Sequence, residues 1–213
     1  MYSVIIAIRK DEFQPELENL DGFSLLSKKL DLLKKIAKID EIIIASNIKY
    51  LEDFSKKEGF KFFLRDDESL KDNAQIFIKN LLKIVKNKEL IFTPCTCLFL
   101  KENLLDECIK EYENLNFSLY DSLLTCTILQ ALVLDDNGAL NFKLIPNELN
   151  TRKLPRLYSI KNACFIISSK MASKYLNYWG KLPYKKVLDK NDVFEVKDEN
   201  DFLFLKNVLR RAL

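Results

Sequence analysis

Short, continuously apolar segments alternate with amphipathic segments along most of this chain. Residues 2–8, YSVIIAI, are followed after a loop by residues 24–39, SLLSKKLDLLKKIAKI, where apolar side chains recur at close to 3.6-residue spacing. The pair repeats as DEIIIAS at 40–46 and a helical segment at 48–59, which Gly59 can cap. Strands that are apolar throughout, each followed by a helix, are typical of a parallel sheet covered on both faces. The pattern therefore predicts a doubly wound, three-layer αβα sandwich with right-handed crossovers.

The alternation continues to about residue 114 and then changes. Before that point we expect two further strands, each followed by a helix: FKFFLR at 60–65, DNAQIFIKNLLKIVKN at 72–87, ELIFTPC at 89–95 and ENLLDECIKEYEN at 102–114. Beyond residue 120, two strand-like runs enclose Asp136-Asn137-Gly138, which favours a β-hairpin. Residues 156–172 then predict a buried strand leading into a helix, and the segment after residue 189 predicts a strand and a final helix.

Composition limits the classes of function that remain. With 213 residues and 48% apolar content, the chain is expected to form one domain, 1–213, carrying a hairpin excursion at about 123–160. Its 34 basic and 31 acidic side chains are interspersed, which does not indicate nucleic-acid binding. No apolar run reaches the roughly 18 residues of a membrane span, so no membrane partner is expected. The absence of histidine excludes histidine-based triads, histidine general bases and histidine-ligated zinc.

Five cysteines, an odd number in apolar surroundings, indicate reduced core residues of a cytoplasmic protein. Cys95 and Cys97 form a C-x-C pair, which is a weak metal signal without a second pair nearby. The interpretation of this pair as two small residues near a strand end is favoured over a metal site.

Seven short motifs occur in an order that resembles the acylneuraminate cytidylyltransferases and their Kdo-activating relatives. The motifs are Ile-x-x-Arg at 6–9, Gly-x-x-Leu at 22–25, IDEIIIAS at 39–46, LRDDESLKDNAQ at 64–75, FTPCTCLFL at 92–100, YDSLLTCT at 120–127 and RKLPRLYSIKNACFI at 152–166. The resemblance covers almost the whole chain. It implies a Rossmann-like, mostly parallel sheet of the nucleotide-diphospho-sugar transferase type, with the hairpin serving dimerisation.

The resemblance also implies an activity and the residues that carry it. The activity is transfer of CMP from CTP, or use of another cytidine nucleotide, to an acidic sugar for surface polysaccharide biosynthesis, with release of pyrophosphate and with Mg²⁺ as cofactor. A homodimer is implied as well. Phosphates would be held by Arg9 and Lys10, the nucleotide by Arg9, Arg65, Asp72, Asn73 and Thr93, the sugar acid by Arg152, Arg156 and Tyr158, and Mg²⁺ by Glu195 or Asp198.

Simpler structural roles compete with several of these assignments. Arg9 can be a solvated charge at a strand end, and Asp72 can be an ordinary helix N-cap. The segment containing Arg152 and Arg156 can be a solvated loop. Trp179 and Tyr184 flank GKLPY, an expected loop in which aromatic packing is favoured over a stacking platform.

Two departures from the family pattern point to an alternative function. The loop after Arg9 is acidic and has no glycine until Gly22, whereas the family has a glycine-rich, basic loop for the triphosphate. Glu195-Val196-Lys197 stands where the family has Asp-x-Asp for the metal, and an ammonium group has no lone pair to offer. The alternative is a catalytically impaired or repurposed member that binds a nucleotide or sugar, or acts as a partner subunit. A different activity on a similar fold is the third hypothesis.

Overall fold

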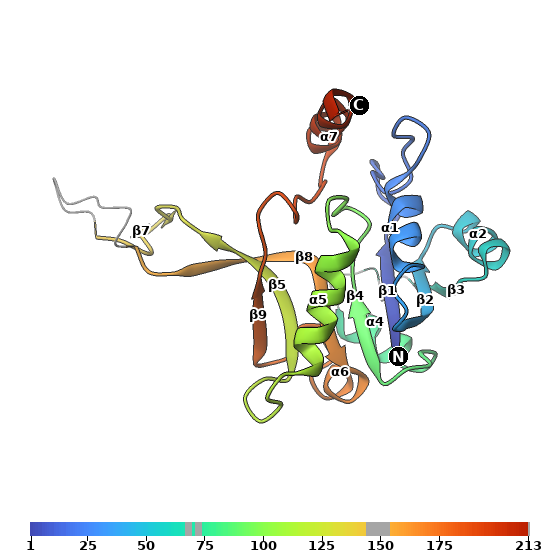
Figure 1. The fold of residues 1–213 in the computed structure, drawn as a ribbon, viewed down its shortest axis with the longest axis horizontal. Helices are drawn as coiled ribbons and strands as arrows, with labels where there is room; N and C mark the ends of the chain where they lie inside the picture. The colour runs from blue at the N-terminus through green and yellow to red at the C-terminus, as the bar shows by residue number, and fades with distance from the viewer. Residues whose placement is uncertain (67–69, 71–73, 144–153, 213) are drawn as a thin grey trace.

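A computed structural model of the chain describes all residues except 67–69, 71–73, 144–153 and 213 (Figure 1). Within this part lies a seven-stranded sheet of order β3-β2-β1-β4-β8-β5-β9. Only β8 runs antiparallel to its neighbours, β4 and β5, so the predicted mostly parallel sheet is confirmed. The strands are β1 Tyr2–Ile8, β2 Ile39–Ser46, β3 Lys61–Leu64, β4 Glu89–Phe92, β5 Ser122–Leu129, β8 Leu157–Ser168 and β9 Pro183–Val187.

Helices cover both faces of the sheet, which confirms the three-layer sandwich. On one face α1, Leu25–Leu33, α2, Tyr50–Glu58, and α5, Glu102–Glu113, pack on the larger apolar core. On the other face α4, Ala74–Leu81, and α6, Ser169–Tyr175, enclose a second core. The C-terminal helix α7, Glu199–Ala212, follows after a long loop (Figure 1). No helix among the described residues has the length and apolar character needed to cross a bilayer.

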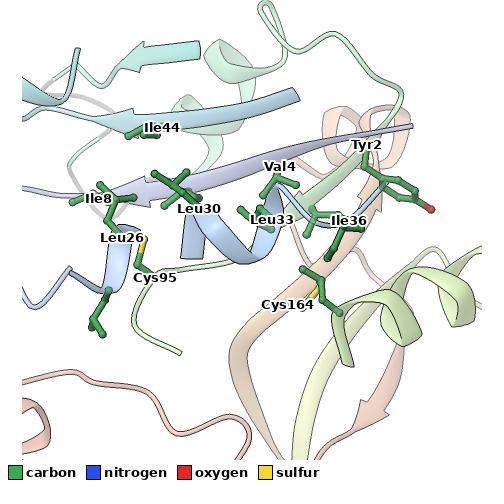
Figure 2. Packing of buried hydrophobic residues seen from close by; sticks show 14 of the residues in the cluster. Tyr2, Val4, Ile8, Leu26, Leu30, Leu33, Ile36, Ile44, Cys95 and Cys164 are labelled. Atoms are coloured by element: carbon green, nitrogen blue, oxygen red, sulfur yellow. The ribbon is translucent and has the colours of Figure 1, made fainter. Parts of the chain in front are cut away.

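Strand β1 has apolar side chains on both of its faces because it lies between two helix layers. Val4 and Ile6 belong to the core under α1, whereas Ile5 belongs to the core under α4. Figure 2 shows Leu30 and Leu33 of α1 lying against this strand. A continuous apolar run is what such a position requires, since alternation would place polar groups in one of the two cores.

The hairpin excursion is a long two-stranded arm. Strands β5 and β8 extend beyond the body of the molecule, and β6, Leu134–Asp135, pairs with β7, Gly138–Ala139, near the far end (Figure 1). At the turn, Asp135 Oδ1 accepts the N–H of Asn137 at 2.8 Å, and Gly138 has φ +127°. The hairpin predicted at Asp136-Asn137-Gly138 is therefore confirmed.

The end of the chain differs from the sequence-based expectation. No strand forms at 192–197, where the chain runs as a loop held by a bond from Val196 N–H to the Thr96 carbonyl at 3.0 Å. The seventh strand is instead β9, whose first two residues, Pro183 and Tyr184, belong to the GKLPY segment that the sequence predicted as a loop. This strand lies at the sheet edge, begins with Pro183 and contains two lysines, so it has no continuous apolar run.

One charged side chain lies inside the larger core region. Lys29 of α1 is 3% exposed, and its ammonium donates to Thr93 Oγ1 at 3.2 Å and to the Cys97 carbonyl at 3.5 Å. Burial lowers the pKa of Lys29. The neighbouring cysteines act in the opposite direction but do not cancel this effect. In the described part of the chain no carboxylate forms an ion pair with it. A buried ammonium with neutral partners costs free energy of folding.

We expect Lys29→Met to raise the free energy of unfolding by about 1–4 kcal/mol, because an apolar chain of similar length replaces a buried charge. The pKa of Lys29 is lowered by folding, so its destabilising effect is complete at acidic pH and fades as pH rises toward the pKa of a free lysine. Urea unfolding across this range measures both effects. The exposed neighbour Lys28→Met is the control, and a loss of stability in Lys29→Met at every pH would contradict the expectation.

Candidate functional site: a cavity at the carboxyl ends of the parallel strands

Two adjoining cavities open at the edge of the sheet where β1, β3 and β4 end. The larger has a volume of about 520 Å³ and the smaller about 190 Å³. They share Ala7, Phe77 and Tyr178 as lining residues. Ligands of open α/β sheets bind at this edge, outside the carboxyl ends of the strands, so the larger cavity is the candidate site.

Two arginines line the larger cavity, and both follow directly after a strand. Arg9 comes after β1, and Arg65 comes after β3, where its backbone N–H bonds to the Ser46 carbonyl at 3.0 Å. The Arg65 guanidinium lies over the ring of Phe77, 4.7 Å from its centroid. Burial lowers the pKa of Arg65, and the charge of Arg9 lowers it further, yet a guanidinium stays protonated at neutral pH. The structure therefore places together the two arginines that the sequence nominated.

The loop after Arg9 brings carboxylates into the same cavity. Asp11 and Glu16 both line it, and Asp11 Oδ2 lies 3.4 Å from Arg9 Nη2. Burial raises the pKa of Glu16, and the nearby charge of Asp11 raises it further. Since no glycine opens the backbone here, the cavity wall consists of side chains instead of a cradle of amides.

Lys10 does not line the cavity in which it was expected to bind phosphate. Its backbone N–H donates to Asn47 Oδ1 at 2.8 Å, which ties the first loop to the end of β2. Its side chain is exposed and is not among the described groups that line either cavity. The first loop is fixed further by Phe13, whose ring meets Phe202 of α7 edge-on at 5.8 Å.

The loop after β4 lines both cavities, the smaller with Thr93 and Pro94 and the larger with Thr96. Thr93 lines the smaller cavity, and its hydroxyl donates to the Ala163 carbonyl at 2.7 Å while accepting from Lys29. Burial raises the pKa of Cys97 to about 11 and that of Cys95 further, so both remain protonated thiols at neutral pH. Both thiols are free and buried, as the structural interpretation of the C-x-C pair predicts.

The two acids nominated for Mg²⁺ have other partners. Glu195 Oε1 accepts from Asn162 Nδ2 at 3.0 Å, and Glu195 Oε2 lies 3.6 Å from Lys197 Nζ. Asp198 Oδ1 accepts the N–H of Asp201 at 2.9 Å, which makes Asp198 the cap of α7. The described residues contain no group of three or more acidic, cysteine or histidine side chains that could hold a metal. Mg²⁺ is usually bound through one or two carboxylates; here Glu195 lies beside an ammonium that repels the metal and Asp198 caps a helix, so this donor set does not fit it.

An aromatic wall closes the cavity on the side of α6. Tyr178 stacks on Phe92 with a centroid distance of 5.1 Å, and Trp179 meets Tyr178 edge-on at 4.8 Å. Trp179 is 41% exposed and lines the larger cavity, where a planar ring could stack on it. Tyr184, by contrast, packs edge-on against Tyr120 at 5.3 Å, as the packing interpretation predicts.

Hydrogen bonds from two side chains to the backbone hold the loop that carries Trp179. The Asp121 carboxylate accepts the N–H groups of Lys181 and Leu182 at 3.0–3.2 Å. The Ser122 hydroxyl donates to the Trp179 carbonyl at 2.6 Å. Trp179 is therefore fixed by groups from a distant part of the sequence, at the start of β5.

Two of the three residues nominated for the sugar acid, Arg156 and Tyr158, lie on the arm. Arg156 is exposed, and its guanidinium sits over the ring of Tyr158, 5.4 Å from the centroid. Lys185 approaches the same ring at 5.7 Å. Neither Arg156 nor Tyr158 is among the described residues that line the two cavities. The remaining nominated residues, Asp72, Asn73 and Arg152, lie outside the described residues.

Comparison with solved structures identifies the fold. The chain matches the 4-diphosphocytidyl-2C-methyl-D-erythritol synthase of Anaerococcus prevotii with a TM-score of 0.71 at 16% identity, over 99% of this chain and 96% of that one. It matches a CMP:2-keto-3-deoxy-manno-octonic acid synthetase complexed with CTP with a TM-score of 0.71 at 11% identity, over 100% and 99% of the two chains. The chain has the α/β nucleotide-diphospho-sugar transferase fold of these structures. The bifunctional IspDF of Campylobacter jejuni gives a TM-score of 0.67 at 17% identity, over 94% of this chain and 53% of that one.

No protein-family model matches the chain, and no curated protein matches it by sequence. At identities this low the structural likeness establishes the fold and not the substrate. The predicted fold of the nucleotide-diphospho-sugar transferase type is confirmed, whereas the acylneuraminate-specific part of the resemblance stays a prediction.

We expect Gly180→Ala to destabilise the loop that carries Trp179. Gly180 has φ +76°, and a Cβ there would overlap the Asp121 carboxylate and the Ser122 hydroxyl. Gly59→Ala is a matched control, because Gly59 has φ +75° and open space around the added atom. Gly180→Ala should lose about 1–3 kcal/mol more than Gly59→Ala in urea unfolding, through overpacking. It should also shift the emission of Trp179, and equal losses in the two variants would contradict this steric account.

Proposed function

We propose that this protein is a cytoplasmic, CTP-dependent nucleotidyltransferase that transfers CMP to an acidic sugar for a surface polysaccharide. The observation that carries the proposal is the pair of arginines, Arg9 and Arg65, which face one cavity at the carboxyl edge of a cytidylyltransferase fold. Guanidinium groups bind phosphate through paired N–H donors. The exposed face of Trp179 supplies a surface on which the cytosine or sugar ring can stack.

The proposed reaction is an in-line displacement at phosphorus. A hydroxyl oxygen of the sugar forms a bond to the α-phosphorus of CTP while the bond from that phosphorus to the β-bridging oxygen breaks. Pyrophosphate leaves with the electron pair of the broken bond, and the hydroxyl proton passes to a base. Glu16 lines the cavity and has a raised pKa, which makes it a stronger base than an ordinary carboxylate.

Two observations favour a second candidate, a nucleotide-binding protein without transferase activity. Asp11 and Glu16 line the cavity and repel a triphosphate, and Lys197 lies beside Glu195 where a metal-binding carboxylate would be needed. Pyrophosphate release in the presence of CTP and an acidic sugar separates the candidates. Turnover supports the transferase, whereas binding of CTP without turnover supports the second candidate.

Fluorescence of Trp179, the single tryptophan of the chain, tests nucleotide binding directly. We expect CTP to change its emission with saturation and to release heat in calorimetry, because the indole faces the cavity. Arg9→Leu and Arg65→Leu should each weaken binding roughly tenfold to a hundredfold through loss of charged hydrogen bonds. The exposed Arg210→Leu, which is not a cavity residue, is the control.

Absence of both heat and fluorescence change at millimolar CTP would refute nucleotide binding. Because Arg65 packs on Phe77, circular dichroism should confirm that its variant is folded. Arg9 is exposed, so Arg9→Leu remains informative even if the Arg65 variant fails to fold.

The proposal includes a homodimer formed through the arm. Large apolar side chains are exposed along it, among them Leu134 at 60%, Leu140 at 61% and Ile160 at 60%. Exposed apolar groups on a projecting element are typical of an interaction surface. In such a dimer Arg156 and Tyr158 of one subunit would be available to the sugar acid bound by the other.

Sedimentation velocity at micromolar concentration should therefore show a dimer. We expect Leu140→Asp combined with Ile160→Asp to shift the protein to monomer, because a carboxylate in an apolar interface carries a large desolvation cost. Leu203→Asp on α7, where the native side chain is also 58% exposed, should leave the dimer intact. A monomeric wild-type protein at tens of micromolar would contradict the dimer proposal.

A further inference from the structure

Three separate segments each contribute one cation to the larger cavity. Arg9 follows β1, Arg65 follows β3, and Lys197 precedes α7. The Lys197 side chain is 68% exposed, so its ammonium can move toward a ligand. Its backbone is fixed, since Lys197 N–H donates to Asp201 Oδ2 at 3.0 Å. The cavity therefore has, besides the two arginines of the strand ends, an exposed lysine side chain on an anchored backbone.

The carboxylate next to this lysine is already compensated. Glu195 accepts from the Asn162 amide at 3.0 Å through one oxygen and lies 3.6 Å from the Lys197 ammonium through the other. A divalent cation at Glu195 would have to displace the ammonium or tolerate its repulsion at short range. The nearby Asp198 and Asp201 carboxylates accept backbone N–H groups at the start of α7.

We propose that the cavity binds the phosphate of a cytidine nucleotide without a divalent cation, and that the Lys197 ammonium supplies the third positive charge beside Arg9 and Arg65. This inference rests on the proposed function. Lys197 carries three N–H donors, of which the Glu195 contact occupies one side, so the others can reach a phosphate oxygen. Three carboxylates, Asp11, Glu16 and Glu195, lie at the two cavities beside these three cations, so a bound phosphate competes with the Asp11 and Glu195 contacts for the cations.

The test uses CMP as the probe and compares binding in EDTA with binding in Mg²⁺. Calorimetry gives the affinity, and Trp179 emission provides a second readout. We expect the same dissociation constant in both conditions for the wild-type protein. Lys197→Gln should weaken CMP binding about tenfold in EDTA and in Mg²⁺ alike, because a charged phosphate contact is lost. Lys190→Gln, an exposed lysine outside the cavity, is the matched control.

Charge reversal makes the test sharper. Lys197→Asp places a second carboxylate two residues from Glu195 and removes the ammonium that compensates it. This variant should bind CMP at least tenfold more weakly than wild type in EDTA and should recover affinity when Mg²⁺ is added. Electron paramagnetic resonance with Mn²⁺ alone should detect bound ion in Lys197→Asp and not in the wild-type protein.

The outcomes separate this inference from the proposed function. Wild-type binding of CMP only in the presence of Mg²⁺, or a Lys197→Gln affinity equal to that of Lys190→Gln, overturns the inference and leaves the nucleotide site standing. Metal-independent CMP binding without pyrophosphate release from CTP supports the inference and rejects the transferase. Failure of both CMP and CTP to bind rejects both.

Discussion

The double pairing of β1 is the constraint on which the rest of the molecule depends. This strand pairs in parallel with β2 on one side and β4 on the other, so Ile8 lies opposite Ser46 and Ile5 opposite Phe92. Because both neighbours run in the same direction, the chain leaves all three strands at one edge of the sheet. Burial on both faces also prevents a one-residue shift, which would exchange the side chains between two different cores. The position of Arg9 and of the loop after β4 follows directly from this pairing.

The cavity that results is built from side chains, and this explains how it can contain acids. In a glycine-rich loop the positive potential comes from fixed amides, and a carboxylate there would oppose the ligand directly. Here the Asp11 carboxylate lies beside the Arg9 guanidinium, and Glu195 lies beside Lys197. A ligand anion that binds Arg9 or Lys197 therefore replaces or adds to an existing contact with a carboxylate.

The sequence predicted the parts of the fold that are decided locally. The apolar runs of β1, β2 and β4 identify central strands, Gly59 ends α2 with φ +75°, and the strand ends place Arg9 and Arg65 at one edge. Elements that depend on distant contacts were missed. Strand β9 has no apolar run because it lies at the edge, and the orientation of Trp179 depends on Asp121 and Ser122, far away in the sequence.

The burial of Lys29 is another feature that the sequence did not reveal, because lysine is usually exposed and this one lies on the apolar face of α1. Its side-chain nitrogen donates to Thr93 Oγ1 at 3.2 Å, and Thr93 lines the smaller cavity. Burial disfavours the charged form of Lys29, and the hydroxyl and carbonyl that accept its hydrogen bonds offset that cost only in part. The contact joins α1 to the loop after β4 beside the cavity, through residues that no phosphate-binding motif would identify.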